Sequence, residues 1–383
     1  MGIAVLYSHG IIDAKYQRIV RKTMIFNLEQ YLTDGLGRLI KDALKVTFKN
    51  RKQSAFFLRF AQSANNASAR RNELGKTGLH VPPFLIASIT GDCNLNCTGC
   101  YSQANGSPAK AKELTASEWG RIFKEAANLG VSVILLAGGE PLLRSDVILA
   151  AAKQKDILFP VFTNGTMLDR SAIRLFEDFR NMIPIISIEG DEAVTDSRRG
   201  QGVHKKALVA MSTLNERGLM FGVSVTVTSA NLDATTDKGF ISELERYGCK
   251  VALFVEYVPF EQPDIALHGE TRSRLAARID ELRTCTKGTI IISFPGDEAE
   301  SGGCLAAGRG FFHISATGDA EPCPFSPYSD LNLRDKSLRE AIMSPFFTRL
   351  REDGILSAAH TGGCVLFEQE ETVARMASQG SGL

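Results

Sequence analysis

The chain has 383 residues, of which 44% are hydrophobic and 23% are charged, and its formal net charge is +1. This composition supports a large folded core and excludes a chain that is disordered as a whole. No apolar run approaches the roughly eighteen residues that a membrane span needs, and the first ten residues lack the charged start and cleavage site of a signal peptide. The sequence therefore predicts a cytoplasmic protein.

The first eighty residues are basic, with fourteen Lys/Arg against five Asp/Glu, so the remainder carries a surplus of eight negative charges. Residues 26–48 and 55–67 place apolar residues at helical spacing, with Lys and Arg at the other positions. Such helices either pack their apolar face on a neighbouring domain, lie on an anionic membrane surface, or hold an acidic peptide or lipid. Nucleic-acid binding is not expected, because few aromatic residues are interleaved with the charge.

Residues 84–258 alternate short β-rich runs with amphipathic helical runs, one of which opens with the capping box Thr115-Ala-Ser-Glu118. Six strand-helix units in series predict an α/β fold with parallel strands and right-handed crossovers. Six units are fewer than the eight of a closed barrel, so the sheet should form a partial barrel with its chemistry at the carboxyl ends of the strands. The predicted strands are Phe84–Ile89, Val131–Leu136, Ile157–Thr163, Ile183–Ile188, Phe221–Thr228 and Ala252–Val258.

Three cysteines follow the first predicted strand, at Cys93, Cys97 and Cys100, in a Cys-x3-Cys-x2-Cys spacing. A compact loop with three thiolates can hold three irons of a four-iron, four-sulfur cube and leave the fourth iron open. Structural zinc normally takes four closed ligands, and no second cysteine pair lies nearby. A two-cluster ferredoxin would need a fourth cysteine soon after the third. The triplet therefore predicts a cluster whose open iron is a reaction site.

Polar motifs follow the next strands. Gly138-Gly139-Glu140-Pro141 comes after the second strand, where two glycines allow close backbone approach and the glutamate offers an acceptor for an ammonium group. Asn164 ends the third strand, and Ser187-Ile188-Glu189-Gly190 ends the fourth. Hydroxyl, amide and carboxylate groups suit hydrogen bonds to a ribose, and the later Arg199 can pair with a carboxylate. Ser224, Thr226 and Thr228 alternate on one strand face, which is either a polar barrel interior or a solvated face.

These motifs resemble those of the radical S-adenosylmethionine (SAM) superfamily, in which the open iron is chelated by the amino and carboxylate groups of SAM. The resemblance implies that the Gly138-Gly139-Glu140 segment holds the SAM amino group. It also implies SAM contacts for the polar residues that follow, Asn164, Ser187, Glu189 and Arg199. Many relatives carry an aromatic residue just before the third cysteine. Here that place is Gly99, and the aromatic residue is Tyr101.

A second cysteine set lies near the C-terminus. Residues 311–323 predict two short strands joined at Ala-Thr-Gly-Asp, and such a hairpin brings Cys304 and Cys323 toward one site, to which Cys364 could return. The spacing resembles the twitch and SPASM modules, which implies an auxiliary 4Fe-4S cluster on Cys304, Cys323 and Cys364. Four sources for its remaining ligand stay open: Cys285, His360, Glu368 and the substrate itself. Cys249, like Cys285, otherwise fits a plain buried thiol.

The resulting organisation has a basic helical segment at 1–80, a partial barrel of the radical SAM type at 81–290 and a small α+β auxiliary-cluster domain at 291–383. The resemblance implies reductive cleavage of SAM to a 5′-deoxyadenosyl radical, which removes hydrogen from a substrate peptide or small molecule. An electron donor such as flavodoxin or ferredoxin is implied as a partner. Three alternatives stay open: a two-cluster electron carrier without SAM chemistry, a zinc-holding binding protein, and a membrane-surface enzyme that acts on a lipid.

Overall fold

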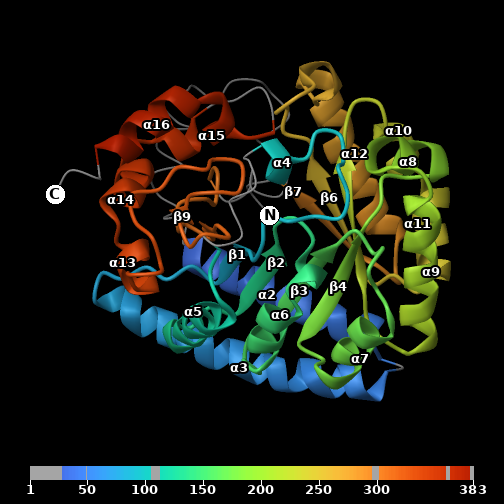
Figure 1. Ribbon diagram of the computed structural model, residues 1–383, viewed down its shortest axis with the longest axis horizontal. Coiled ribbons are helices and arrows are strands. Elements are labelled where there is room, and N and C mark those ends of the chain that lie inside the picture. Colours follow the sequence, from blue (N-terminus) through green and yellow to red (C-terminus); the bar gives the residue numbers. More distant parts are fainter. Residues whose placement is uncertain (1–27, 49, 105–112, 296–301, 359–362, 380–383) are drawn as a thin grey trace, which may run out of the picture.

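A computed structural model describes residues 28–48, 50–104, 113–295, 302–358 and 363–379 (Figure 1). Its centre is a nine-stranded sheet in the order β7-β6-β5-β4-β3-β2-β1-β8-β9. The strands β1 to β7 pair in parallel, each with the next strand of the sequence. Their bounds are β1 Phe84–Ser88, β2 Val133–Ala137, β3 Phe159–Thr163, β4 Met182–Ser187, β5 Gly222–Val227, β6 Val251–Glu256 and β7 Ile290–Phe294. The predicted α/β fold with a parallel sheet is therefore confirmed.

The series of parallel strands joined by helices has a seventh member, β7, beyond the six predicted. Strand β7 pairs with β6 from Val251↔Ile290 to Val255↔Phe294 and forms one edge of the sheet. Its short apolar run, Ile290–Ile292, stands at the end of the alternating pattern, and periodicity alone does not distinguish such a run from another buried segment.

The predicted C-terminal hairpin is present and joins the other side of the sheet. Strand β8 (His313–Ile314) pairs antiparallel with β9 (Ala320–Glu321), as the turn residues predict. In addition, β8 pairs in parallel with β1, with Ile86 opposite His313. The hairpin between Cys304 and Cys323 is thus hydrogen-bonded to the strand that leads into the first cysteine loop.

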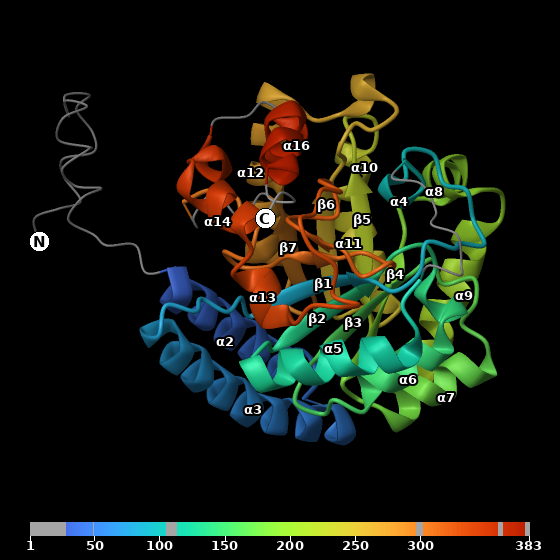
Figure 2. The same ribbon diagram turned by 60° about the vertical axis from the view of Figure 1, so that its left-hand side comes forward.

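Helices connect the parallel strands and cover one face of the sheet (Figures 1 and 2). The capping box at Thr115 and Glu118 is formed, and it opens α5 (Ala116–Leu129) as predicted. Trp119 and Phe123 of this helix are fully buried and stack on each other, and Phe123 contacts Phe159 of β3, because the apolar stripe of a crossover helix packs on the sheet. The other connecting helices are α6 Ser145–Ala152, α7 Arg170–Asp178, α8 Glu192–Arg199, α9 Val203–Glu216, α10 Leu232–Thr235, α11 Lys238–Arg246 and α12 Gly269–Cys285.

The two basic N-terminal helices pack on the opposite face of the sheet. Helices α2 (Leu28–Val46) and α3 (Arg51–Lys76) bury Leu36, Phe57 and Phe60 against Val133 and Ile183. Val133 and its neighbour Ile134 belong to different clusters, because successive strand residues point to opposite faces. Figure 2 shows both helices below the strands. Of the three roles considered for this apolar face, the structure supports packing on the neighbouring domain.

Helices of the C-terminal part lie together beside the hairpin (Figure 1). The helix-like stretch from Leu338 to Asp353 is divided into α13 (Leu338–Ile342) and α14 (Pro345–Glu352). Pro345 cannot continue a helix but is favoured at its first turn, where Ser344 caps it by accepting from the Phe347 N–H. Helices α15 (Val365–Glu368) and α16 (Glu370–Ser378) follow Cys364. Across the described ranges, no helix is long and apolar enough to cross a membrane.

Candidate SAM and iron–sulfur site

The first cysteine set lies in the loop between β1 and the short helix α4 (Tyr101–Ala104). Cys93, Cys97 and Cys100 are all half-buried. Burial raises the pKa of Cys93 and of Cys97. A bound cation reverses this, because a coordinating thiol is deprotonated.

The Gly138-Gly139 pair docks the loop after β2 onto this cysteine loop. Gly139 N–H donates to the Thr90 carbonyl at 2.8 Å, and Glu140 N–H donates to the Asp92 carbonyl at 2.8 Å. A Cβ on Gly139 would lie 1.9 Å from the Asp92 oxygen, and one on Gly138, whose φ is +121°, would lie 2.2 Å from the Thr90 oxygen. Only glycine fits at either position, so the pair is needed for loop packing whether or not a ligand approaches it.

Glu140 is 1% exposed and ties β2 to β3. Its carboxylate accepts from Thr163 Oγ1 at 2.8 Å, from Asn164 N–H at 2.8 Å and from Leu142 N–H at 3.1 Å. Burial raises the pKa of Glu140, although these donors oppose the rise. The predicted contact of this carboxylate with an ammonium group stays a prediction, and its three donors show that it also fixes the backbone of the glycine loop.

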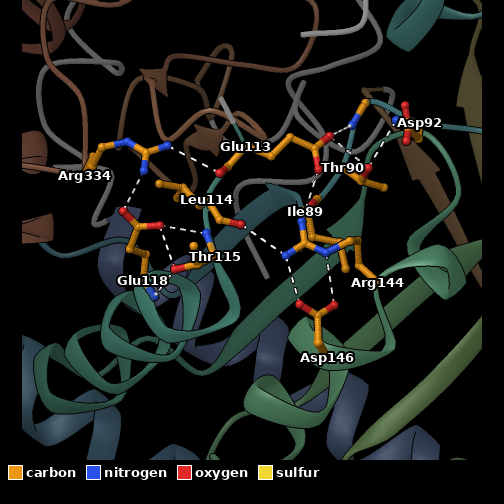
Figure 3. Close-up of polar contacts among 11 residues, drawn as sticks. Ile89, Thr90, Asp92, Glu113, Leu114, Thr115, Glu118, Arg144, Asp146 and Arg334 are labelled. Atoms are coloured by element: carbon orange, nitrogen blue, oxygen red, sulfur yellow. Dashed lines mark hydrogen bonds and ion pairs between the residues drawn. The ribbon is translucent and has the colours of Figure 1, made fainter. Parts of the chain in front are cut away.

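A second buried carboxylate, Glu113, braces the base of the cysteine loop (Figure 3). It accepts from Gly91 N–H at 2.7 Å, from Thr90 Oγ1 at 2.9 Å and from Arg144 Nη1 at 3.1 Å. Arg144 also donates to the backbone carbonyl of Ile89, at the end of β1. The sequence analysis missed both charged residues, because neither stands in a recognisable motif.

Glu189 holds two arginines where β4 meets α8. It is fully buried, and its carboxylate accepts from Arg199 Nε at 2.5 Å, Arg199 Nη2 at 2.5 Å and Arg198 Nη1 at 2.8 Å. Burial by itself would raise the pKa of Glu189, but Arg199 and Arg198 bring it below the ordinary value. The two guanidinium groups also oppose the rise in the pKa of Cys97. This part of the site therefore carries one net positive charge beside a cysteine.

The interior strand face changes from apolar to polar toward the carboxyl ends of the strands. On β4, Ile183 and Ile185 pack against the N-terminal helices, whereas the half-buried Ser187 follows on the same face and stands opposite Ser224 of β5. Arg198 Nη1 donates to Thr226 Oγ1 at 3.1 Å. The serine and threonine face of β5 is therefore a polar barrel interior and not a solvated surface.

Two further contacts hold the segment between the first and third cysteines. Asn164 Nδ2 donates to Asn94 Oδ1 at 2.8 Å, and Thr98 N–H donates to the Arg198 carbonyl at 2.9 Å. Asn164, Glu189 and Arg199 thus lie on elements that contact the cysteine loop, and their SAM contacts stay predictions.

The ring of Tyr257 fills the space beside Gly99. A Cβ on Gly99, whose φ is +66°, would lie 2.8 Å from Tyr257 Cε2 and from its hydroxyl oxygen. Gly99 N–H also donates to Glu261 Oε2 at 2.8 Å. The aromatic residue that many relatives place in this loop would not fit here, because an aromatic residue from the end of β6 occupies the position.

The second cysteine set is brought together as predicted. The thiols of Cys323 and Cys364 lie side by side, and the proximity of Cys364 and Cys304 adds to the effect of burial in raising the pKa of Cys323 well above its ordinary value. The buried hydroxyl of Ser326, three residues after Cys323, has no hydrogen-bond partner among the described residues. Three thiols in one place, with an unpartnered buried hydroxyl nearby, fit a bound group that supplies positive charge and acceptors.

The other cysteines lie elsewhere. Cys249 is buried before β6, its Sγ lies 3.2 Å from the Val251 carbonyl, and burial raises its pKa to about 12. Cys285 is exposed at the end of α12, where the chain enters β7, at the opposite end of the strands from both cysteine sets. Topology therefore argues against Cys285 as a ligand. Glu368 lies in α15, and His360 lies outside the described residues.

Aromatic side chains connect the two cysteine sets. Tyr101, directly after Cys100, makes an edge-to-face contact with Phe325, two residues after Cys323, with ring centroids 5.4 Å apart. Phe260 contacts Phe325 at 6.1 Å and Phe367 at 4.9 Å, and so links the end of the barrel to the segment after Cys364.

Within the described ranges, no three His, Cys, Asp or Glu side chains are arranged to hold a single metal ion. A cubic cluster requires another arrangement, since each thiolate binds a separate iron.

Comparisons with known proteins agree with this geometry. The family model described as the Radical SAM superfamily matches residues 87–242. The AdoMet-dependent heme synthase of Methanosarcina barkeri is 32% identical over 289 residues, which cover 67% of this chain and 81% of that protein. The PqqA peptide cyclase of Granulibacter bethesdensis is 29% identical over 264 residues, covering 63% of this chain and 68% of the cyclase.

Solved structures share the fold at low sequence identity. Streptococcus suis SuiB bound to the precursor peptide SuiA matches with a TM-score of 0.61 and 18% identity, covering 76% of this chain and 71% of SuiB. The structure of SuiB bound to S-adenosylmethionine matches with a TM-score of 0.59, also at 18% identity, covering 77% of this chain and 71% of SuiB.

Proposed function

The chain belongs to the radical SAM superfamily, and from this premise we propose that it cleaves SAM reductively at a cluster held by Cys93, Cys97 and Cys100. Membership implies an enzyme that uses a 4Fe-4S cluster and SAM. The observation that carries the proposal is that the Gly138-Gly139 loop and the Glu189–Arg199 pair both adjoin the cysteine loop. An electron carrier has no need of either.

The chain's own residues would bind and orient SAM. The cluster supplies, when bound, an open iron and the electron that cleaves the sulfonium. The net positive charge of Arg198, Arg199 and Glu189 favours the methionine carboxylate near Cys97. The glycine loop, fixed by Glu140, offers backbone groups to the amino group, and Ser187 offers a hydroxyl to the ribose. Formation of 5′-deoxyadenosine in the presence of SAM and dithionite tests this proposal.

We further propose that Cys304, Cys323 and Cys364 bind an auxiliary 4Fe-4S cluster. The contact between Cys323 and Cys364, with Cys304 nearby, supports a shared site. The aromatic contact between Tyr101 and Phe325 supports a location close to the first cluster. Such a cluster could accept the electron of a substrate radical or bind the substrate. The names of the curated relatives point to heme synthesis and peptide cyclisation, so the substrate class proposed is a peptide or a cofactor precursor.

Replacing Cys304, Cys323 and Cys364 together by Ala tests the auxiliary cluster. We expect the iron content of anaerobically reconstituted protein to fall from roughly eight to roughly four per chain, because one of two four-iron clusters loses its ligands. SAM cleavage by dithionite should persist, since the first cysteine loop is unchanged. Iron analysis and the yield of 5′-deoxyadenosine measure the two effects. An unchanged iron content would contradict the auxiliary cluster and leave the first proposal standing.

A further inference from the structure

A two-residue turn after Cys323 places a serine beside this cysteine. Cys323 and Ser326 form an antiparallel bridge, with Pro324 and Phe325 at the turn between them. Ser326 N–H donates to the Cys323 carbonyl at 2.9 Å. Directly opposed residues of an antiparallel pair carry their side chains on one face, with Cβ atoms about 4.5–5.5 Å apart. The Ser326 hydroxyl and the Cys323 thiol therefore lie on the same face of this turn.

The hydroxyl of Ser326 is buried without a partner. Cys323 and Ser326 are each 2% exposed, and Ser326 Oγ makes no hydrogen bond to any residue that the structure describes. By contrast, Ser329 Oγ, three residues further along, donates to the Leu331 carbonyl at 2.7 Å. Because an unpaired buried hydroxyl is unfavourable, its presence in a folded protein indicates a bound ion or group that pairs with it.

Backbone hydrogen bonds bring the other two cysteine segments to this turn. Ala307 N–H, in the loop after Cys304, donates at 3.1 Å to the carbonyl of Pro322, which directly precedes the turn. Cys304 N–H donates at 2.8 Å to the carbonyl of Leu356. The short 3-10 helix of Leu356 contacts α15, the helix that follows Cys364. Three thiols and one unpartnered hydroxyl are therefore supplied by segments that pack together.

The spacing of the serine from the cysteine is that of a common pair of cluster ligands. Cys323-Pro-Phe-Ser326 has the separation of a Cys-x2-Cys pair, which recurs among the ligands of four-iron clusters. Three thiolates bind three irons of a cube, so the fourth iron needs one more ligand. Iron also takes oxygen ligands, and a hydroxyl that binds it releases its proton to solvent.

We propose that Ser326 Oγ is the fourth protein ligand of the auxiliary cluster on Cys304, Cys323 and Cys364. This inference rests on the proposed auxiliary cluster and completes its ligand set. A cube with four protein ligands has no open iron. Of the two roles proposed for this cluster, the assignment therefore supports electron acceptance and not substrate binding. No motif indicated Ser326, because serine is common in turns and only the structure shows its burial.

Ser326→Ala and Ser326→Cys test the ligand in a full-length parent variant in which Cys93, Cys97 and Cys100 are replaced by Ala, so that only the auxiliary cluster is present. In the parent, we expect a distinct Mössbauer signal from one of the four irons, because oxygen is a harder ligand than sulfur. Ser326→Cys should make the four irons alike. On mild oxidation the parent should keep all four irons. Ser326→Ala should instead pass one electron to ferricyanide and release one ferrous ion, about a quarter of its iron, and show the EPR signal of a three-iron cluster.

Ser329→Ala is the matched control, because it removes a hydroxyl that already has a partner in the same segment. It should leave the iron content and the Mössbauer spectrum of the parent unchanged. Four irons retained by Ser326→Ala after oxidation, or equal iron loss from the parent, would overturn the inference and return the fourth ligand to His360 or Glu368. If Ser326→Ala assembles no cluster, the comparison of the parent with Ser326→Cys decides. A parent variant that binds no iron would refute the proposed auxiliary cluster itself.

Discussion

Joint replacement of Cys93, Cys97 and Cys100 by Ala is expected to abolish 5′-deoxyadenosine formation and to remove about half of the iron. The three thiols are the predicted ligands of the cluster that reduces SAM, and no other described cysteine lies on this loop. The second set should retain its own cluster, because its ligands come from the hairpin and from the segment before α15. Iron and sulfide analysis, with chromatographic detection of 5′-deoxyadenosine, measures the result.

Cys285→Ala is the control for the triple variant. Its thiol is exposed at the end of α12, beyond both cysteine sets, so its replacement should leave the iron content and the SAM cleavage unchanged. A triple variant that still cleaves SAM would show that the reaction site is elsewhere. A triple variant with no iron at all would indicate that the two sites do not assemble independently.

Glu189→Gln is expected to lower the free energy of unfolding by about 3–5 kcal/mol, because it leaves two guanidinium groups without their buried counter-charge. Glu189 is fully buried, and Arg198 and Arg199 both bond to its carboxylate. Urea unfolding of wild type and variant at neutral pH, followed by circular dichroism, measures the difference.

Glu281→Gln makes the same chemical change at an exposed ion pair. Lys238 Nζ lies 2.7 Å from Glu281 Oε1, and the two side chains are 60% and 44% exposed. We expect a much smaller loss of stability than in Glu189→Gln, because water and salt screen an exposed pair. Equal losses in the two variants would contradict the structural role assigned to the buried cluster.

Much of the barrel could be predicted because its pattern is local. Each of the six predicted strands combines a short apolar run with a following helix, and the capping box at Thr115 identified the start of α5. The pairing of β8 with β1 could not be predicted, because two residues of β8 carry no periodicity and their partner lies more than 220 positions away. Which strand pairs at the edge of a sheet depends on contacts between distant parts of the chain, and a local sequence pattern does not contain them.

The residues of the candidate site also divide into those that a motif predicted and those that only the structure identified. Cysteine spacing and the glycine pair identified the loops, since these residue types are rare in such arrangements. Glu113 and Arg144, which brace the cysteine loop, stand in no motif, and their ion pair at 3.1 Å depends on loop packing. The sequence also did not show why Gly138 and Gly139 are both required. The structure shows that the Thr90 and Asp92 carbonyls lie too close to them for any side chain.

Incubation of the anaerobically reconstituted protein with SAM and dithionite tests the central claim most directly. The account predicts that 5′-deoxyadenosine and methionine form in equal amounts, and that neither forms without reductant, because cleavage needs one electron from the cluster. Intact clusters with no 5′-deoxyadenosine would contradict the account and would favour an electron carrier. Stoichiometric zinc in place of iron would also contradict it and would favour a zinc-holding binding protein.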